Sequence, residues 1–107
     1  MIDGQVVPRD AAARVTLDDG LVRGDGIFEG MRFYDRTPRT PDAHLERLAT
    51  SGDGAGIRVD VELLRREMAD FGEALVTPDS AVRLMITRSG IRIWREEPLP
   101  VFGPEGM

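Results

Sequence analysis

Arginine is the residue type through which this sequence could bind an anion. The chain has fourteen basic residues, and all of them are arginine. His44 and Arg47 stand three residues apart in a predicted helix, so their side chains share one face of it. A guanidinium group matches the oxygens of phosphate or carboxylate with two parallel hydrogen bonds. This face is a candidate anion site, and an ordinary solvated surface is the alternative.

A second candidate lies in the stretch 27–34, which is rich in aromatic and β-favouring residues and predicts a strand. Side chains alternate between the two faces of a strand. One predicted face carries Phe28, Gly30, Arg32 and Tyr34. Glycine weakens a strand, so Gly30 marks either the close approach of a ligand or backbone, or a bulge or tight packing contact.

Arg83 stands in the middle of an apolar segment, 81–88, that predicts a central strand. Burial of an arginine is costly unless the charge is paired. Arg83 is therefore either a paired, functional charge or a residue of an edge position that reaches solvent.

Two helices must position these residues. Asp42 is the predicted N-cap of a helix that starts at Ala43, and the glycines at 52, 54 and 56 are predicted to end it. Asp60 is the predicted N-cap of the second helix. The apolar residues of that helix follow a spacing of three and four that predicts a buried stripe: Val61, Leu64, Met68, Phe71 and Leu75.

The remaining segments predict short extended pieces. Residues 1–7 predict a hairpin around Asp3-Gly4, 15–17 a short extended segment, and 91–94 a strand that pairs back after the turn at Ser89-Gly90. Residues 96–107 contain three prolines and predict a tail. Together these elements predict one small α+β domain over residues 1–107.

Composition excludes several classes of site and partner. The absence of cysteine excludes disulfides and thiolate chemistry, and the single histidine excludes a multi-histidine metal site. A net charge of −5 argues against nucleic-acid binding. No apolar run approaches the roughly 20 residues of a membrane span, and the N-terminus lacks the pattern of a signal peptide. We therefore expect a cytoplasmic protein.

Three ordered motifs resemble those of class IV, fold-type IV, pyridoxal-phosphate (PLP) enzymes. This family includes branched-chain and D-amino-acid aminotransferases and aminodeoxychorismate lyase. The motifs are Asp18-Asp19-Gly20-Leu21-Val22-Arg23-Gly24-Asp25-Gly26-Ile27-Phe28-Glu29-Gly30-Met31-Arg32, then Asp42-Ala43-His44-Leu45-Glu46-Arg47-Leu48, then Val82-Arg83-Leu84-Met85-Ile86-Thr87-Arg88. The resemblance implies the small N-terminal domain of that fold, an antiparallel sheet packed with two helices.

The resemblance also implies roles for individual residues. Arg47 would bind the cofactor phosphate, with His44 beside it. Phe28 and Gly30 would line the substrate pocket, and Arg32 on the same strand face would contribute. Arg83 would recognise the substrate carboxylate. In other branches of the family that contact comes from further along the chain, which makes Arg88 and Arg92 weaker candidates.

The family's catalytic lysine has no counterpart, since this sequence contains no lysine. Members of the family have a second domain that carries the lysine, and we expect that domain to be absent from this chain. The implied function is one part of an aminotransferase acting on amino acids and 2-oxo acids, homodimeric like its family and inactive alone. The alternatives are an aminodeoxychorismate lyase-like domain and a non-catalytic domain that binds a partner subunit or an anion.

Overall fold

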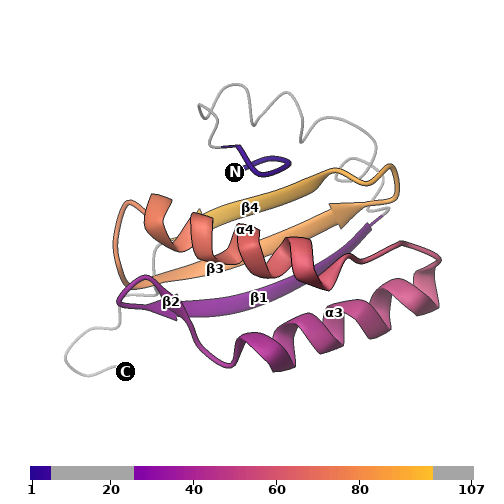
Figure 1. Ribbon diagram of the computed structural model, residues 1–107, viewed down its shortest axis with the longest axis horizontal. Helices are drawn as coiled ribbons and strands as arrows, with labels where there is room; N and C mark the ends of the chain where they lie inside the picture. Colours follow the sequence, from indigo (N-terminus) through magenta and orange to yellow (C-terminus); the bar gives the residue numbers. More distant parts are fainter. Residues whose placement is uncertain (6–25, 98–107) are drawn as a thin grey trace, which may run out of the picture.

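Two helices cover one face of a four-stranded antiparallel sheet in the computed structural model, which describes residues 1–5 and 26–97 (Figure 1). The strands are β1 (Gly26–Tyr34), β2 (Thr37–Pro38), β3 (Ser80–Thr87) and β4 (Arg92–Glu97), and the helices are α3 (Pro41–Ala55) and α4 (Val61–Ala74). The strand order is β2-β1-β3-β4. This architecture confirms the predicted α+β fold with an antiparallel sheet and two helices.

The period-two pattern predicted for β1 is present. Ile27, Met31 and Phe33 are buried beneath the helices, whereas the residues between them are more exposed. The partners of the buried residues on β3 are buried as well, because directly opposed residues share a face. Among the described residues, the two faces of β1 therefore have different environments: helices pack on one face and not on the other.

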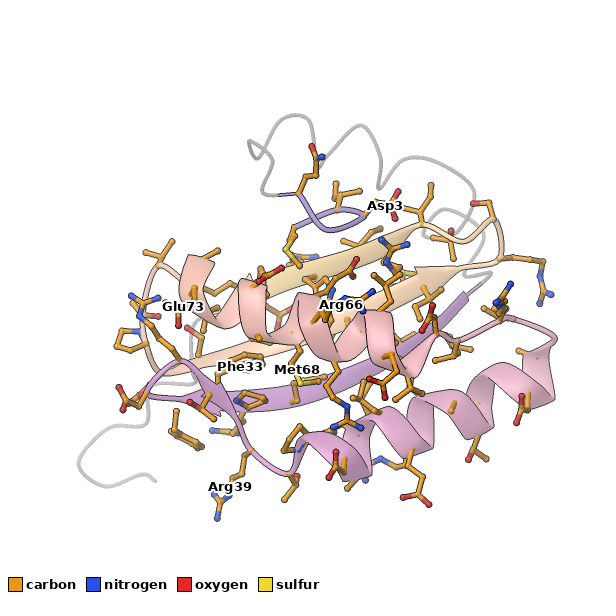
Figure 2. All side chains as sticks on the ribbon, in the orientation of Figure 1. Asp3, Phe33, Arg39, Arg66, Met68 and Glu73 are labelled. Carbon is orange, nitrogen blue, oxygen red and sulfur yellow. The ribbon has the colours of Figure 1, made fainter. Side chains whose placement is uncertain are left out.

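Helix α4 contributes a stripe of apolar side chains to the core. The Asp60 side chain accepts a hydrogen bond from the Leu63 backbone N–H at 3.1 Å, which confirms the predicted N-cap. Leu64, Met68, Phe71 and Leu75 are all buried, as the spacing predicts, and Val61 packs against the core from a partly buried position. In Figure 2 the side chains of Phe33 and Met68 lie together between the sheet and α4.

Helix α3 begins earlier and continues further than predicted. Its N-cap is Thr40, not Asp42, because Pro41 is already at the first helical position; Asp42 instead pairs with Arg65 of α4. The helix continues through Gly52, where a Cβ would come within 2.5 Å of Val59, and ends at Gly56 in the left-handed conformation. Only the last of the three glycines ends the helix.

The N-terminal residues 1–5 contact β4. Ile2 and Gln5 pair around Asp3-Gly4, as predicted, and Ile2 also pairs with Ile93. The predictions for residues 6–7, 15–17 and 98–107 lie outside the described residues. Strand β4 continues to Glu97, so the prediction that a tail starts at Glu96 was wrong.

Glu96 explains why the strand continues. Its carboxylate accepts hydrogen bonds from the backbone N–H groups of Val76 and Thr77 at 2.8 and 3.0 Å and from the Ser80 hydroxyl at 2.8 Å. These bonds tie the end of β4 to the α4–β3 connection.

Within the described ranges, no helix has the length and apolarity needed to cross a membrane.

Candidate functional site

Glu29, His44 and Arg47 form a polar cluster between β1 and α3. One oxygen of Glu29, Oε2, lies 2.7 Å from Nδ1 of His44. The same oxygen accepts hydrogen bonds from Nε and Nη2 of Arg47 at 3.0 and 2.7 Å. The predicted helix face of His44 and Arg47 therefore meets an acidic residue of the neighbouring strand.

Nδ1 of His44 lies within hydrogen-bond distance of two partners. It is 2.7 Å from Oε2 of Glu29 and 2.9 Å from Nη2 of Arg47. With a proton on Nδ1, His44 donates to the Glu29 carboxylate; with a proton on Nε2 alone, Nδ1 accepts from Arg47. In both forms Glu29 accepts from Arg47, and the three side chains contact one another.

An open pocket of about 500 Å³ adjoins this cluster. Its lining comes from Glu29 and from one side of α3: Ala43, Glu46, Arg47, Thr50 and Ser51. The Arg47 guanidinium group and the Ser51 hydroxyl are hydrogen-bond donors suited to an anion. The Thr50 hydroxyl already donates to the Glu46 carbonyl, at 3.0 Å, and Glu46 adds a carboxylate at the same pocket. The structure thus gives the predicted anion face a definite location beside the β1 edge of the sheet.

The other predicted binding residues lie on the opposite side of the sheet. Phe28, Gly30 and Arg32 of β1 are exposed on the face that the two helices leave uncovered. Arg83 of β3 lies opposite Gly30 and joins them on that face. The structure brings these four residues together and separates them from Arg47, which lies on the helix side.

Arg83 combines features of both alternatives that the sequence left open. Its strand is an inner strand, between β1 and β4, yet its side chain is 58% exposed. Nε of Arg83 lies 3.8 Å from a carboxylate oxygen of Glu97, a distance too long for a strong ion pair. Its guanidinium group is accessible from the uncovered face.

Arg88 and Arg92, the weaker candidates, lie elsewhere. Arg88 donates a hydrogen bond to the Ala55 carbonyl at the end of α3, at 3.0 Å. Arg92 binds the buried Glu67 through Nε and Nη2, at 2.8 and 2.6 Å. These hydrogen bonds to Glu67 raise the pKa of Arg92, with partial burial acting in the opposite direction. The geometry makes Arg92 part of the helix–sheet packing.

Two acidic residues at these sites, Glu29 and Glu67, were not among the predicted ones. Each occupies an inward position of its element: Glu29 shares a face of β1 with the buried Ile27 and Met31, and Glu67 is 3% exposed on α4. A carboxylate at such a position needs a partner. That inward position was a signal in the sequence, but it does not identify the partner.

Similar proteins of known sequence or structure match most of this chain. No family model matches the sequence. A putative branched-chain-amino-acid aminotransferase of Methanocaldococcus jannaschii is 34% identical over 91 residues, which are 81% of this chain and 31% of that protein. A crystal structure of 4-amino-4-deoxychorismate lyase from Pseudomonas aeruginosa superposes on 95% of the chain, with a TM-score of 0.78 and 30% identity. A PLP-bound hypothetical aminotransferase from Mycobacterium tuberculosis superposes on 90% of it, with a TM-score of 0.68 and 26% identity.

The chain spans less than half the length of each of these proteins: 31%, 40% and 35%. The matches nevertheless extend over most of the chain itself: 81%, 95% and 90%. Sequence and structure agree that the chain belongs to the class IV aminotransferase family, whose fold is fold type IV.

Proposed function

We propose that this chain supplies the phosphate-binding arginine and part of the substrate pocket of a PLP-dependent class IV aminotransferase. The observation that carries the proposal is the position of Arg47, whose side chain is 64% exposed at a pocket although its inner edge is held by Glu29. A phosphate group needs donors, and Arg47 and Ser51 provide them. The residues present therefore fit the phosphate end of this cofactor.

The uncovered face of the sheet would hold the substrate. Over residues 26–32, no described strand pairs with β1 on the side away from β3, so the cofactor and the substrate would meet around this edge of β1. A guanidinium group such as that of Arg83 binds a carboxylate with two hydrogen bonds, which suits an amino acid or 2-oxo acid. Gly30 leaves the space opposite Arg83 open, and Phe28, 65% exposed, offers an apolar wall. Arg32 adds a second positive charge on the same face.

PLP supplies an electron-withdrawing ring on which amino-group transfer takes place. The covalent link to a lysine and the proton transfers by that lysine must come from outside these 107 residues, because the sequence has no lysine. In this proposal the chain forms a small N-terminal domain that binds and orients, next to a lysine-bearing domain. We also propose the cytoplasm as its location and a homodimer as the complete enzyme.

The second candidate is a lyase. The aminodeoxychorismate lyase of Pseudomonas aeruginosa superposes with a TM-score of 0.78, against 0.68 for the aminotransferase of Mycobacterium tuberculosis. The two reactions are separated by assaying the chain together with its lysine-bearing domain. Consumption of 4-amino-4-deoxychorismate would support the lyase, and transfer of an amino group to a 2-oxo acid would support the aminotransferase.

Phosphate binding is tested on the chain by itself. We would titrate the folded chain with PLP and with inorganic phosphate and follow arginine side-chain N–H resonances. Binding that is lost in Arg47→Ala and retained in Arg66→Ala, a matched exposed arginine on α4, would support the proposal. Equal affinity of Arg47→Ala and wild-type chain would refute the role of Arg47.

A further inference from the structure

We propose that Glu29 is the positioning residue of the anion site: it orients Arg47 so that the outer edge of the guanidinium group faces the pocket. The inference rests on the proposed function, in which Arg47 binds the cofactor phosphate. It adds Glu29 to the site. Charge repulsion alone would make a carboxylate weaken the binding of an anion, whereas in this proposal Glu29 strengthens it.

The donor geometry of Arg47 supports this role. A guanidinium group has five N–H bonds. Glu29 receives the Nε–H and one N–H of Nη2, both on one edge of the group. Nη2 also lies 2.9 Å from Nδ1 of His44, whereas Nη1 has no hydrogen-bond partner among the described residues. The N–H bonds of Nη1 are therefore the donors that remain for a phosphate.

The burial of the three side chains shows which one is fixed. The side chains of Glu29 and His44 are 15% and 13% exposed, whereas that of Arg47 is 64% exposed. Glu29 stands on β1, paired with the fully buried Leu84 of β3, so its backbone is held by the sheet. Nδ1 of His44 contacts the same carboxylate from a second side, 2.7 Å from Oε2.

Without this anchor the exposed arginine would rotate freely. Ordering a long side chain on binding costs about 0.5–1.5 kcal/mol, so preorganisation strengthens binding by roughly three- to tenfold. The opposing effect is the repulsion between the Glu29 carboxylate and a bound anion. Glu46 provides a control for that repulsion. It lines the same pocket and, within the described part of the chain, forms no ion pair with Arg47.

The test compares three variants of the folded chain, titrated with inorganic phosphate and with PLP. Glu29→Gln keeps the size of the side chain and removes its charge, and we expect affinity to fall about three- to tenfold. Glu46→Gln removes the same charge from the same pocket, and we expect unchanged or tighter binding. Glu29→Asp keeps the charge but withdraws the oxygen from Arg47, and we expect weaker binding than wild type.

Arg47 gives a spectroscopic signature that a general loss of stability would not produce. In the wild-type chain its Nε–H resonance should be shifted by the carboxylate and protected from exchange with water. In Glu29→Gln the resonance should move to the position of an exposed arginine while the backbone spectrum of the core stays unchanged.

The outcomes separate the two proposals. If Arg47→Ala abolishes binding while Glu29→Gln and Glu29→Asp bind as tightly as wild type or more tightly, the positioning role is wrong and the phosphate site stands. If the wild-type chain binds neither ligand, or Arg47→Ala binds equally well, both proposals are wrong. Weaker binding in both Glu29 variants, with Glu46→Gln unaffected, supports both.

Discussion

Gly30 of β1 and Arg83 of β3 lie directly opposite each other on the face of the sheet that the helices leave uncovered. The ladder between the two strands is continuous from Gly26 to Phe33, so no bulge explains the glycine. A Cβ at position 30 would meet no atom of the described residues within 4 Å, so no packing contact among them explains it either. Among the described residues, the glycine leaves open space beside Arg83, and the proposed substrate site uses this space.

Gly30→Ala should therefore make the chain more stable. Glycine in the interior of a strand is about 0.5–1 kcal/mol less favourable than alanine, and position 30 has room for the methyl group. We expect the free energy of unfolding in urea to rise by that amount. In the complete enzyme the same change should raise KM for the carboxylate substrate. Loss of stability in the isolated chain would contradict the assignment of open space at Gly30.

Gly72 shows the opposite situation, in which a glycine is required by packing. A Cβ there would come within 2.3 Å of the Arg36 carbonyl oxygen. Nη1 of Arg36 donates to the carbonyls of Gly72, Glu73 and Leu75, so the β1–β2 turn caps the end of α4. Any shift forced at Gly72 also disturbs this cap.

We expect Gly72→Ala to lower the free energy of unfolding by about 1–3 kcal/mol, the usual cost of overpacking. Gly54→Ala is the matched control, since Gly54 also lies in a helix but would have nothing within 4 Å of its Cβ. The control should gain up to about 1 kcal/mol, because alanine has the higher helix propensity. Urea denaturation of both variants measures the difference in the free energy of unfolding. If Gly72→Ala changed this free energy by the same amount as Gly54→Ala, the packing assignment at Gly72 would be refuted.

Glu67 joins α4 to β4 beneath the surface. It accepts from Arg92 and, at 3.0 Å, from Nε1 of the buried Trp94. Removal of one partner of a buried ion pair costs about 3–5 kcal/mol, and the 22% exposure of Arg92 reduces this value. We expect Glu67→Ala to lose about 2–3 kcal/mol.

The exposed pair of Asp42 and Arg65 provides the comparison, because its side chains are 79% and 46% exposed. Exposed ion pairs contribute about 0–1 kcal/mol, so Arg65→Ala should have little effect. The wavelength of Trp94 fluorescence gives a second measurement: a red shift is expected for Glu67→Ala only. A loss below about 1 kcal/mol for Glu67→Ala would show that the pair adds no net stability.

Glu96 should make stability depend on acid pH. Partial burial raises its pKa, but hydrogen bonds from Val76, Thr77 and Ser80 outweigh this effect and hold the pKa below its ordinary value of 4.5. The stabilisation is thus fully present above pH 4.5 and is lost as pH falls through the lowered pKa of the folded chain. We expect the stability difference between wild type and Glu96→Gln to be constant near neutral pH and to shrink below pH 4.5. A difference that grows on acidification would contradict the assignment.

Much of the fold could be predicted because its signals are local. The spacing of apolar residues in α4, its Asp60 cap and the alternation of β1 are each visible within one turn or a few residues. The prediction of Asp42 as the N-cap of α3 was wrong. Asp42 is a good capping residue in isolation, but Pro41 next to it fixes an earlier start. Local signals compete at a boundary, and the sequence does not show which one prevails.

The polar contacts were less predictable because they join residues far apart in the chain. Glu29 meets His44 and Arg47 across separations of 15 and 18 residues, and Glu96 meets Val76 across 20. Such partners depend on how α3 and the strands are placed in space. The family resemblance supplied roles for Arg47 and Arg83, but only the fold shows that they lie on opposite sides of the sheet.

The absence of lysine leads to a final chemical prediction. PLP forms borohydride-reducible adducts with amines, and this chain offers the amino group of its first residue and no lysine side chain. After incubation with PLP, reduction and proteolysis, mass spectrometry should find no modified internal residue, although phosphate binding through Arg47 is retained. When the lysine-bearing domain is added, the adduct should appear on a lysine of that domain and still on no internal residue of this chain. An adduct on an internal residue of this chain would show that it performs covalent chemistry by itself and would overturn its assignment as a binding and orienting part.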